Sequence, residues 1–326
     1  MSLPAYKAEN FADHLRETPP TTYLRRTHCP ICDAPTSRAT AEMQSQSPAE
    51  HSPPEAHINY FPTEKSHRPC FTYARCGDCG GLYCPVYFRQ DQLNQLYAQQ
   101  NENQIDVPLS SRAATQRAYV EVIQRFAPLE GDYLELGPDI GLFTEAVAKA
   151  GRFGKFYLYE PNLAVHDALS DRMKGHDIRL SNELYRTGLV PPASLSLAVI
   201  IHALDHLLDP ATILRAVYDD LKPGGSVLIV THDEGSPLAR MLGRRWPPYN
   251  LQHPQLFRRS SMKRLVERCG FKVTGFGGTA NYFPAHFLVQ KALGLAGLDG
   301  LVKGWTKSPD LRLQLGNLGT VCQKPH

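Results

Sequence analysis

Between residues 112 and 231, short apolar runs typical of β-strands alternate with longer segments typical of α-helices. Residues 195–202, with the sequence LSLAVIIH, form a nearly continuous apolar run, as expected for a strand covered on both faces of a sheet. The other predicted strands are residues 133–136, 156–159 and 226–231, and the predicted helices are residues 112–126, 142–150, 163–174 and 210–221. This alternation predicts an α/β fold with a doubly wound, mostly parallel sheet and helices on both faces.

A loop with two glycines, ELGPDIG at residues 135–141, joins the first predicted strand to the next helix. Gly137 permits a tight turn and the close approach of a ligand to the backbone, and Gly141 lets the helix begin close to the strand. The first turn of that helix offers free N–H groups to an anionic group. Glu160 ends the following strand, where an acidic side chain can accept hydrogen bonds from both hydroxyls of a ribose. Together these features predict a nucleoside-containing cofactor.

The middle position of this loop argues against a dinucleotide. A pyrophosphate-binding loop normally carries the three glycines of G-x-G-x-x-G, whereas this chain has G-x-D-x-G. The carboxylate of Asp139 would repel a pyrophosphate, so the sequence disfavours cofactors that contain one.

The stretch YLELGPDIGLFTEAVAKAG resembles the first motif of class I S-adenosylmethionine-dependent methyltransferases. Glu135, Gly137 and Gly141 match its acidic residue and two of its glycines, and Glu160 matches the acid that holds the ribose in that family. The resemblance implies a Rossmann-like sheet whose last strand, at residues 315–322, is antiparallel. It also implies S-adenosylmethionine as the cofactor, bound by Glu135, Gly137, Pro138, Asp139, Gly141, Glu160, Pro161 and His202.

Two further stretches are similar to the same family. ALDHLLDP, at residues 203–210, is similar to the LEH…DP stretch after the fourth strand, and LKPGG, at residues 221–225, to the turn before the fifth. Two positions depart from the family pattern. Asp139 stands where the middle glycine is usual, and Ser196 stands where an aspartate often opens the fourth strand. The second departure leaves a catalytically inactive, methyltransferase-like binding protein as an alternative.

Six of the eight cysteines lie between residues 29 and 84, which points to metal or redox chemistry rather than to a disulfide scaffold. Four of them form two C-x2-C pairs, and such turns can bring four thiolates to one tetrahedral zinc ion. The predicted zinc ligands are Cys29, Cys32, Cys76 and Cys79. All coordination positions are then filled, so the zinc is expected to be structural. The alternative ligands are Cys70, Cys84 and His28.

Composition divides the chain into two predicted domains. Residues 1–108 are expected to form a cysteine-rich zinc module with a polar insertion at residues 36–54, and residues 109–326 the S-adenosylmethionine-binding methyltransferase domain. The zinc module resembles that of small-molecule methyltransferases, including sugar C-methyltransferases, in which it covers the substrate side of the site. Within the second domain, the basic region 236–314 is expected to shape the substrate site.

The net charge of +3 conceals an asymmetry along the chain. Residues 236–326 contain 14 Lys and Arg against 3 Asp and Glu, a net charge of +11, and the rest of the chain carries −8. This imbalance favours a small, anionic substrate, although a solvated basic face that pairs with the acidic part is an equal alternative. A second enzyme hypothesis is an RNA methyltransferase that uses the zinc module for substrate binding. Against it, no NPPY or DPPY follows the fourth strand.

Methyl transfer requires alignment of the acceptor and, for a hydroxyl or carbon acid, removal of a proton. Ligands of open α/β sheets bind beyond the carboxyl ends of the strands, and histidine suits proton removal at neutral pH. His202 or His206 is the predicted general base, and His253 and Tyr249 are predicted acceptor contacts. Helix capping or packing is the alternative for His202 and His206, a solvent-exposed loop position for His253, and packing within the loop for Tyr249. The expected acceptor is a sugar, a nucleotide-linked sugar or another biosynthetic intermediate.

No apolar run approaches the roughly 20 residues that span a bilayer, and the N-terminus lacks the apolar region of a secretory signal. We therefore expect a cytoplasmic protein without a transmembrane segment. After residue 276, an apolar helix-like run carries Lys291, Lys303 and Lys307. This run predicts a lid or a dimer surface, with contact to a membrane or a lipid-linked substrate as the alternative. The sequence leaves the oligomeric state open.

Overall fold

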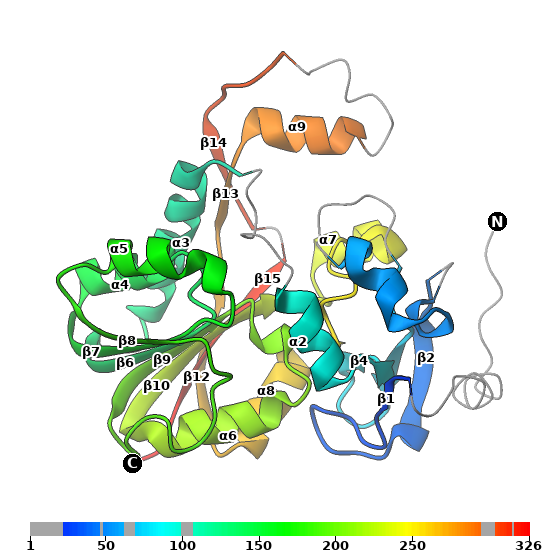
Figure 1. Cartoon of the computed structure of the whole chain (residues 1–326), viewed down its shortest axis with the longest axis horizontal. Helices are drawn as coiled ribbons and strands as arrows, with labels where there is room; N and C mark the ends of the chain where they lie inside the picture. The colour runs from blue at the N-terminus through cyan, green and yellow to red at the C-terminus, as the bar shows by residue number, and fades with distance from the viewer. Residues whose placement is uncertain (1–21, 46–47, 62–68, 99–106, 295–303, 315) are drawn as a thin grey trace.

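The computed structural model describes residues 22–45, 48–61, 69–98, 107–294, 304–314 and 316–326. Two lobes lie side by side in Figure 1: a larger one built on a central sheet, and a smaller one that contains the N-terminal strands. Helix α2 (Gln90–Ala98) lies between them. The smaller lobe and α2 therefore lie next to the edge of the large sheet at which its parallel strands end.

The larger lobe contains a seven-stranded sheet in the order β12-β15-β10-β9-β6-β7-β8. Its strands are β6 (Glu130–Leu136), β7 (Arg152–Tyr159), β8 (Asp177–Ser181), β9 (Leu195–Ile201), β10 (Leu221–His232), β12 (Lys272–Gly278) and β15 (Asn317–Gln323). The strands from β10 to β8 pair in parallel, whereas β15 runs antiparallel to both β10 and β12. The predicted doubly wound, mostly parallel sheet with an antiparallel last strand is confirmed.

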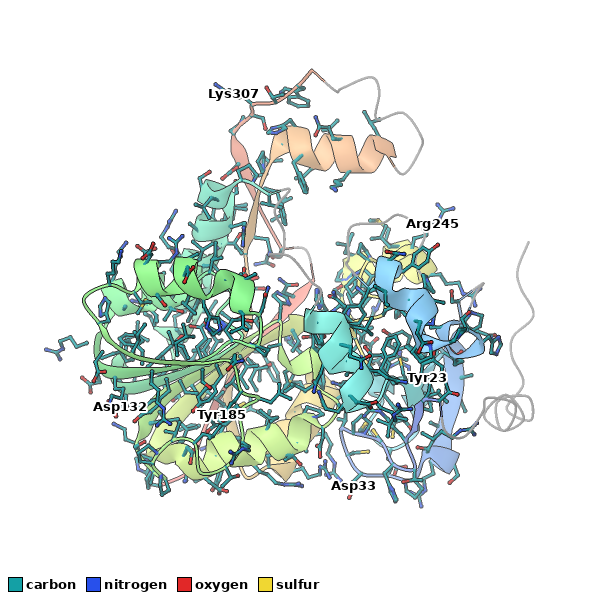
Figure 2. All side chains as sticks on the ribbon, in the orientation of Figure 1. Tyr23, Asp33, Asp132, Tyr185, Arg245 and Lys307 are labelled. Carbon is teal, nitrogen blue, oxygen red and sulfur yellow. The ribbon has the colours of Figure 1, made fainter. Side chains whose placement is uncertain are left out.

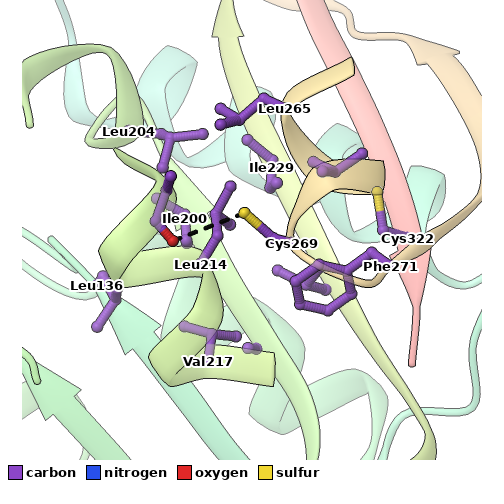
Figure 3. Packing of buried hydrophobic residues seen from close by; sticks show 14 of the residues in the cluster. Leu136, Ile200, Leu204, Leu214, Val217, Ile229, Leu265, Cys269, Phe271 and Cys322 are labelled. Atoms are coloured by element: carbon purple, nitrogen blue, oxygen red, sulfur yellow. Dashed lines mark hydrogen bonds between the residues drawn. The ribbon is translucent and has the colours of Figure 1, made fainter. Parts of the chain in front are cut away.

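Helices cover both faces of this sheet, with α3, α4 and α5 on one face and α6 and α8 on the other (Figure 1). They are α3 (Leu109–Ile123), α4 (Leu142–Ala150), α5 (His166–Arg172), α6 (Pro210–Asp220) and α8 (Arg259–Arg268). Val199 of β9 packs in one cluster with Val147 of α4, and the next residue, Ile200, packs with Leu214 of α6 and Leu265 of α8 (Figure 3). Because side chains alternate along a strand, burial on both faces requires the continuous apolar run.

The predicted elements differ from the observed ones mainly at their ends. Helix α3 begins at Leu109, directly after Pro108, three residues before the predicted start. The predicted helix at residues 163–174 divides into a 3-10 turn, η4 (Leu163–Val165), and α5. The Asn162 side chain accepts a hydrogen bond from the N–H of Ala164 and so caps the turn.

The smaller lobe holds a four-stranded sheet in the order β11-β4-β3-β2 and a separate pair of strands, β1 and β5. The strands are β1 (Leu24–Arg25), β2 (Ala39–Met43), β3 (Tyr73–Cys76), β4 (Leu82–Tyr83), β5 (Val86–Tyr87) and β11 (Gln255–Leu256). Strand β2 lies in the stretch predicted to be an insertion, yet it pairs with β3. This part of the polar stretch is therefore an integral strand of the small sheet.

A segment from far along the chain completes the small lobe. Strand β11 follows β10 by more than twenty residues, yet it pairs with β4. Trp246 and Leu251, from the same segment, are buried in one cluster with Tyr87 and Phe88. The division at residue 108 stays a proposal, and the structure adds residues 239–256 to the core of its first part.

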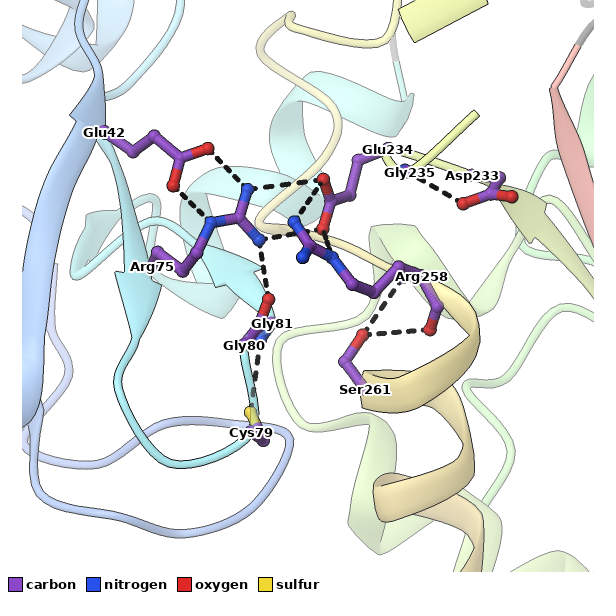
Figure 4. A network of polar contacts seen from close by, with 10 residues as sticks. All are labelled: Glu42, Arg75, Cys79, Gly80, Gly81, Asp233, Glu234, Gly235, Arg258 and Ser261. Atoms are coloured by element: carbon purple, nitrogen blue, oxygen red, sulfur yellow. Dashed lines mark hydrogen bonds and ion pairs between the residues drawn. The ribbon is translucent and has the colours of Figure 1, made fainter. Parts of the chain in front are cut away.

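An ion-pair network joins the two lobes (Figure 4). Glu234, only 3% exposed, follows β10 and accepts hydrogen bonds from Arg258 of the large lobe and Arg75 of β3, with an Arg75 Nη1 to Glu234 Oε1 distance of 2.9 Å. Arg75 also binds Glu42 of β2 and donates to the carbonyl of Gly80 beside the second cysteine pair. A shared buried carboxylate thus fixes the small lobe against the carboxyl end of β10.

Helix α9 (Ala285–Gly294) and the hairpin of β13 (Asn281–Pro284) and β14 (Asp310–Leu313) project from the larger lobe (Figure 1). Figure 2 shows Lys307 at the end of this projection. Lys303 lies outside the described residues, and the lid or dimer role of this region stays a prediction. No helix in the described parts of the chain is both long and apolar enough to cross a bilayer.

Candidate active site

A cavity of about 780 Å³ opens at the carboxyl ends of the parallel strands. It lies at the junction of β6 and β9, from which the chain winds outward in opposite directions along the sheet, and such a junction is the usual ligand site of this fold. Leu93 and Tyr97 of α2 line it, so the small lobe supplies one wall. The volume falls within the roughly 300–1,000 Å³ typical of small-molecule sites.

The glycine loop adopts the left-handed backbone region at three alternate positions. The φ angles are +74° at Gly137, +52° at Asp139 and +78° at Gly141. A Cβ at Gly141 would lie 2.5 Å from Cδ1 of Leu169, so this position requires glycine for space as well as for conformation. Asp139 adopts a left-handed conformation, which glycine takes most readily and which aspartate tolerates better than most side chains.

The carboxylate of Asp139 is paired with a cation of α3. Its Oδ2 accepts a hydrogen bond from Nη2 of Arg112 at 3.0 Å, and the Arg112 side chain is only 9% exposed. The guanidinium of Arg112 thus compensates the negative charge that Asp139 brings into the glycine loop.

Glu160 lies at the wall of the cavity and is 7% exposed. Its two carboxylate oxygens accept from the backbone N–H groups of Asp139 and Asn162, each at 2.9 Å. Burial raises the pKa of Glu160, and these two hydrogen bonds act against the rise. The carboxylate is thereby held in one orientation while its remaining lone pairs stay available to a ligand.

The cavity brings together most of the residues predicted to bind the cofactor. Those that line it are Glu135, Gly137, Pro138, Asp139, Glu160, Pro161 and His202, whereas Gly141 lies behind the loop against Leu169. Their roles stay predictions.

Glu135 is almost fully buried at the end of β6. Its Oε2 accepts hydrogen bonds from the hydroxyl groups of Tyr133 at 2.6 Å and Thr144 at 2.7 Å. Burial raises the pKa of Glu135 to about 7, in spite of these two bonds. The carboxyl group therefore changes its charge near neutral pH, where it faces the cavity.

The four residues predicted to act on the acceptor divide into two pairs. His202 and His206 line the cavity, whereas His253 and Tyr249 are not among the lining residues that the structure describes. His253 is 3% exposed, and its ring lies 4.7 Å from the ring of His206. Tyr249 packs edge-on against Tyr73, with ring centroids 5.3 Å apart. The structure thus brings the three predicted histidines together and packs the partly buried Tyr249 against the core of the small lobe.

Asp205 lies at the centre of this histidine group and was not assigned from the sequence. It is completely buried, and its Oδ2 accepts from Nδ1 of His232 at 2.7 Å. Burial raises the pKa of Asp205, but the hydrogen bond from His232 and the nearby imidazoles hold it well below its ordinary value. The available signal was positional, because His232 ends β10 at the same edge of the sheet as the Asp205–His206 pair after β9.

The four cysteines predicted to bind zinc lie together in the small lobe. The Sγ–Sγ distances are 3.8 Å for Cys29 and Cys79 and 3.5 Å for Cys32 and Cys76, and all four sulfur atoms lie within 4.8 Å of one another. Zinc–sulfur bonds of about 2.3 Å in a tetrahedron separate the sulfur atoms by about 3.8 Å, so these residues fit the ion. The alternatives Cys70, Cys84 and His28 do not belong to this group.

A family model described as a methyltransferase domain matches residues 111–275 of the chain, from α3 to β12. The chain belongs to this methyltransferase family. The match agrees with the motifs of the sequence, which imply an S-adenosylmethionine-dependent enzyme of class I.

Three solved structures illustrate the similarity of the fold. A methyltransferase from Methanosarcina mazei is 14% identical, with a TM-score of 0.41, over 63% of this chain and 97% of that one. A phosphoethanolamine N-methyltransferase of Haemonchus contortus is 18% identical, with a TM-score of 0.42, over 64% and 52%. The cyclase SpnF is 16% identical, with a TM-score of 0.46, over 64% and 80%. No curated protein matches the chain. All three TM-scores lie below 0.5, so nothing about this chain follows from these likenesses.

For this methyltransferase, we expect the Glu135→Gln variant to lose part of the pH dependence of stability. A carboxyl group with a raised pKa in the folded state contributes stability that is complete below its unfolded pKa and is lost as the pH rises through about 7. The amide oxygen of Gln can still accept both hydroxyl groups, because both bond to the same oxygen of Glu135. The variant should therefore gain up to about 3 kcal/mol over the wild type between pH 5 and pH 8.

Denaturant unfolding at pH 5 and pH 8, compared between the two proteins, measures this difference. Glu145→Gln is a suitable control, because Glu145 is the neighbour of Thr144 on α4 but pairs with Lys149 and Arg172. Its carboxylate should stay ionised throughout this range. Parallel pH profiles for the wild type and Glu135→Gln would contradict the assignment.

Proposed function

We propose that this methyltransferase transfers the methyl group of S-adenosylmethionine to a small-molecule acceptor, such as a sugar, a nucleotide-linked sugar or another biosynthetic intermediate. One observation carries the proposal: a single cavity is lined by the glycine loop, by two histidines of the region after β9 and by α2 of the small lobe. A site walled by the second lobe favours a small acceptor over a duplex or a folded RNA.

The residues of the cofactor side support binding of a nucleoside with a cationic sulfonium. The sulfonium supplies an electrophilic methyl group and leaves as a neutral thioether. Glu160 would accept hydrogen bonds from the ribose hydroxyls, and the left-handed turn at Gly137 would let the ligand approach the backbone. Glu135 would place negative charge near the cationic end of the cofactor when it is ionised.

The two histidines that line the cavity favour an acceptor whose proton is easily removed. His202 and His206 reach the cavity, but burial lowers the pKa of both rings, to about 3 for His202. A neutral imidazole with a depressed pKa is a weak base, so it removes a proton efficiently only from an acidified acceptor. Among the described residues of the lining, Arg112 is the one Lys or Arg, and it already binds Asp139. Among the described residues that line the cavity, no second arginine or lysine is therefore present to pair with an anionic acceptor.

The test is transfer of labelled methyl from S-adenosylmethionine to pooled sugar phosphates, nucleotide sugars, hydroxy acids and total RNA. We expect the label in a small molecule and not in RNA. With that acceptor, His206→Ala should lower kcat by about 100-fold or more while the affinity for S-adenosylhomocysteine stays unchanged. His176→Ala, at an exposed position, is the control.

Other outcomes would select the alternatives. Label in RNA, with binding that weakens steeply with salt, would support the RNA methyltransferase. Cofactor binding without transfer to any pool would support a non-catalytic binding protein. Unchanged turnover of the His206→Ala and His202→Ala variants would remove both residues from proton transfer.

A further inference from the structure

A second group of side chains with the chemistry of metal ligands adjoins the cavity. One ligand atom each from Asp205, His206 and His253 lies within 4.8 Å of the other two. A second group with the same spacing shares Asp205 and contains His202 and His232. The ring centroids of His202 and His232 are 4.6 Å apart, and those of His232 and His253 are 4.8 Å apart. Four imidazoles therefore surround one buried carboxylate.

Each member of the first group has a partner that fixes its orientation. Nδ1 of His253 donates to the carbonyl of Pro248 at 2.8 Å, and Nδ1 of His206 is hydrogen-bonded to the hydroxyl of Tyr97 at 3.0 Å. Both rings are thus left with Nε2 as the free nitrogen. Oδ2 of Asp205 is held by His232, which leaves Oδ1. Ligands that are oriented in this way by outer hydrogen bonds are typical of metal sites.

The carboxylate at the centre lacks one partner. Among the described residues, none makes a hydrogen bond to Oδ1 of Asp205, although this side chain is 0% exposed. Nδ1 of His202 is likewise buried without a partner in the described part of the chain. A buried carboxylate oxygen without a donor is costly, whereas a cation beside it removes that cost. Among the residues that the structure describes, His232 is the one ion-pair partner of Asp205, and no lysine or arginine pairs with it.

We propose that Asp205, His206 and His253 bind a divalent first-row transition-metal ion, of the zinc or ferrous type, through Oδ1 and two Nε2 atoms. Two imidazoles and one carboxylate form a ligand set that such ions prefer, and it leaves coordination positions open for other ligands. This site is separate from the four cysteines, which come from the knuckles around β2 and β3.

The proposed ion would also identify the class of acceptor, and this part rests on the proposed function. His206 lines the cavity, so an open position of the ion would face the acceptor. The ion would hold an acceptor through an anionic oxygen or a hydroxyl group and lower the pKa of that hydroxyl. It would supply the positive charge that Arg112, which binds Asp139, does not offer to the acceptor.

The number of ions per chain tests the site without any acceptor. Tag-free protein is equilibrated with Zn²⁺, dialysed in a weak chelator buffer and analysed for metal. We expect two zinc ions per wild-type chain, one in His253→Ala and one in Cys29→Ser, with the control His176→Ala retaining two. Because His253 is buried, circular dichroism verifies the fold, and His206→Ala at the cavity wall provides a second variant.

Cobalt distinguishes which site has been lost. Co²⁺ in the cysteine site should absorb strongly through thiolate charge transfer, and this band should survive in His253→Ala and His206→Ala. Co²⁺ bound by Asp205 and the two histidines should show only weak bands, which should survive in Cys29→Ser. One ion per wild-type chain that only the cysteine variant removes would overturn the proposal, as would a second ion that both histidine variants retain. Two ions without methyl transfer would instead contradict the proposed function alone.

Discussion

Cys76→Ser is expected to remove the zinc ion from the cysteine site and to destabilise the small lobe without unfolding it. Cys76 ends β3, and its sulfur lies 3.5 Å from that of Cys32, so loss of one thiolate opens the tetrahedron. Structural zinc stabilises small domains by roughly 10–16 kcal/mol in isolated zinc-finger peptides. Here the lobe also has its own buried core, so a smaller loss of several kcal/mol is expected.

The consequence should extend to the cavity, because α2 of this lobe forms one of its walls. Zinc content, thermal unfolding and the affinity for S-adenosylhomocysteine measure the effect together. Cys70→Ala is the matched control, since Cys70 is buried in the same lobe but outside the group of four. A Cys76→Ser protein that keeps one zinc in the cysteine site and melts like the wild type would contradict a structural role.

Glu160→Ala is expected to weaken the binding of S-adenosylhomocysteine by more than about 100-fold. A hydrogen bond to a charged group contributes about 1.5–3 kcal/mol, and the carboxylate can accept one from each ribose hydroxyl. The same carboxylate also accepts from the N–H groups of Asp139 and Asn162, so its removal loosens the loop as well. Glu160→Gln retains one acceptor oxygen and should show an intermediate loss.

Calorimetric titration with S-adenosylhomocysteine measures this loss, and zinc content shows that the small lobe is intact. Glu145→Ala is the control, because it removes a carboxylate of α4 that pairs with surface cations. Binding by Glu160→Ala at wild-type affinity would show that the cofactor lies elsewhere in the cavity.

The sheet and its helices were predictable because their signals are short-range. The continuous apolar run of β9 reports burial on two faces, and Gly141 between β6 and α4 reports a close helix contact, here with Leu169. The two C-x2-C pairs were informative for the same reason, since each knuckle is a local turn. The start of α3 at Leu109 and the division of the helix after β7 into η4 and α5 were not predicted, because the apolar periodicity that predicts a helix does not define its exact ends.

The sequence by itself therefore determined the fold class, the glycine loop with the acid that ends the next strand, and the two C-x2-C pairs, because a short local pattern marks each of them. Only the tertiary structure decided how Asp139 is compensated, because Arg112 lies 27 residues earlier. It also decided that β11 completes the small sheet and that Asp205, His206, His232 and His253 meet. Asp205 and His206 follow β9, His232 ends β10, and His253 precedes β11. The adjacency of β9 and β10, together with the docking of the small lobe, brings these three places together. No local periodicity in the chain encodes that contact.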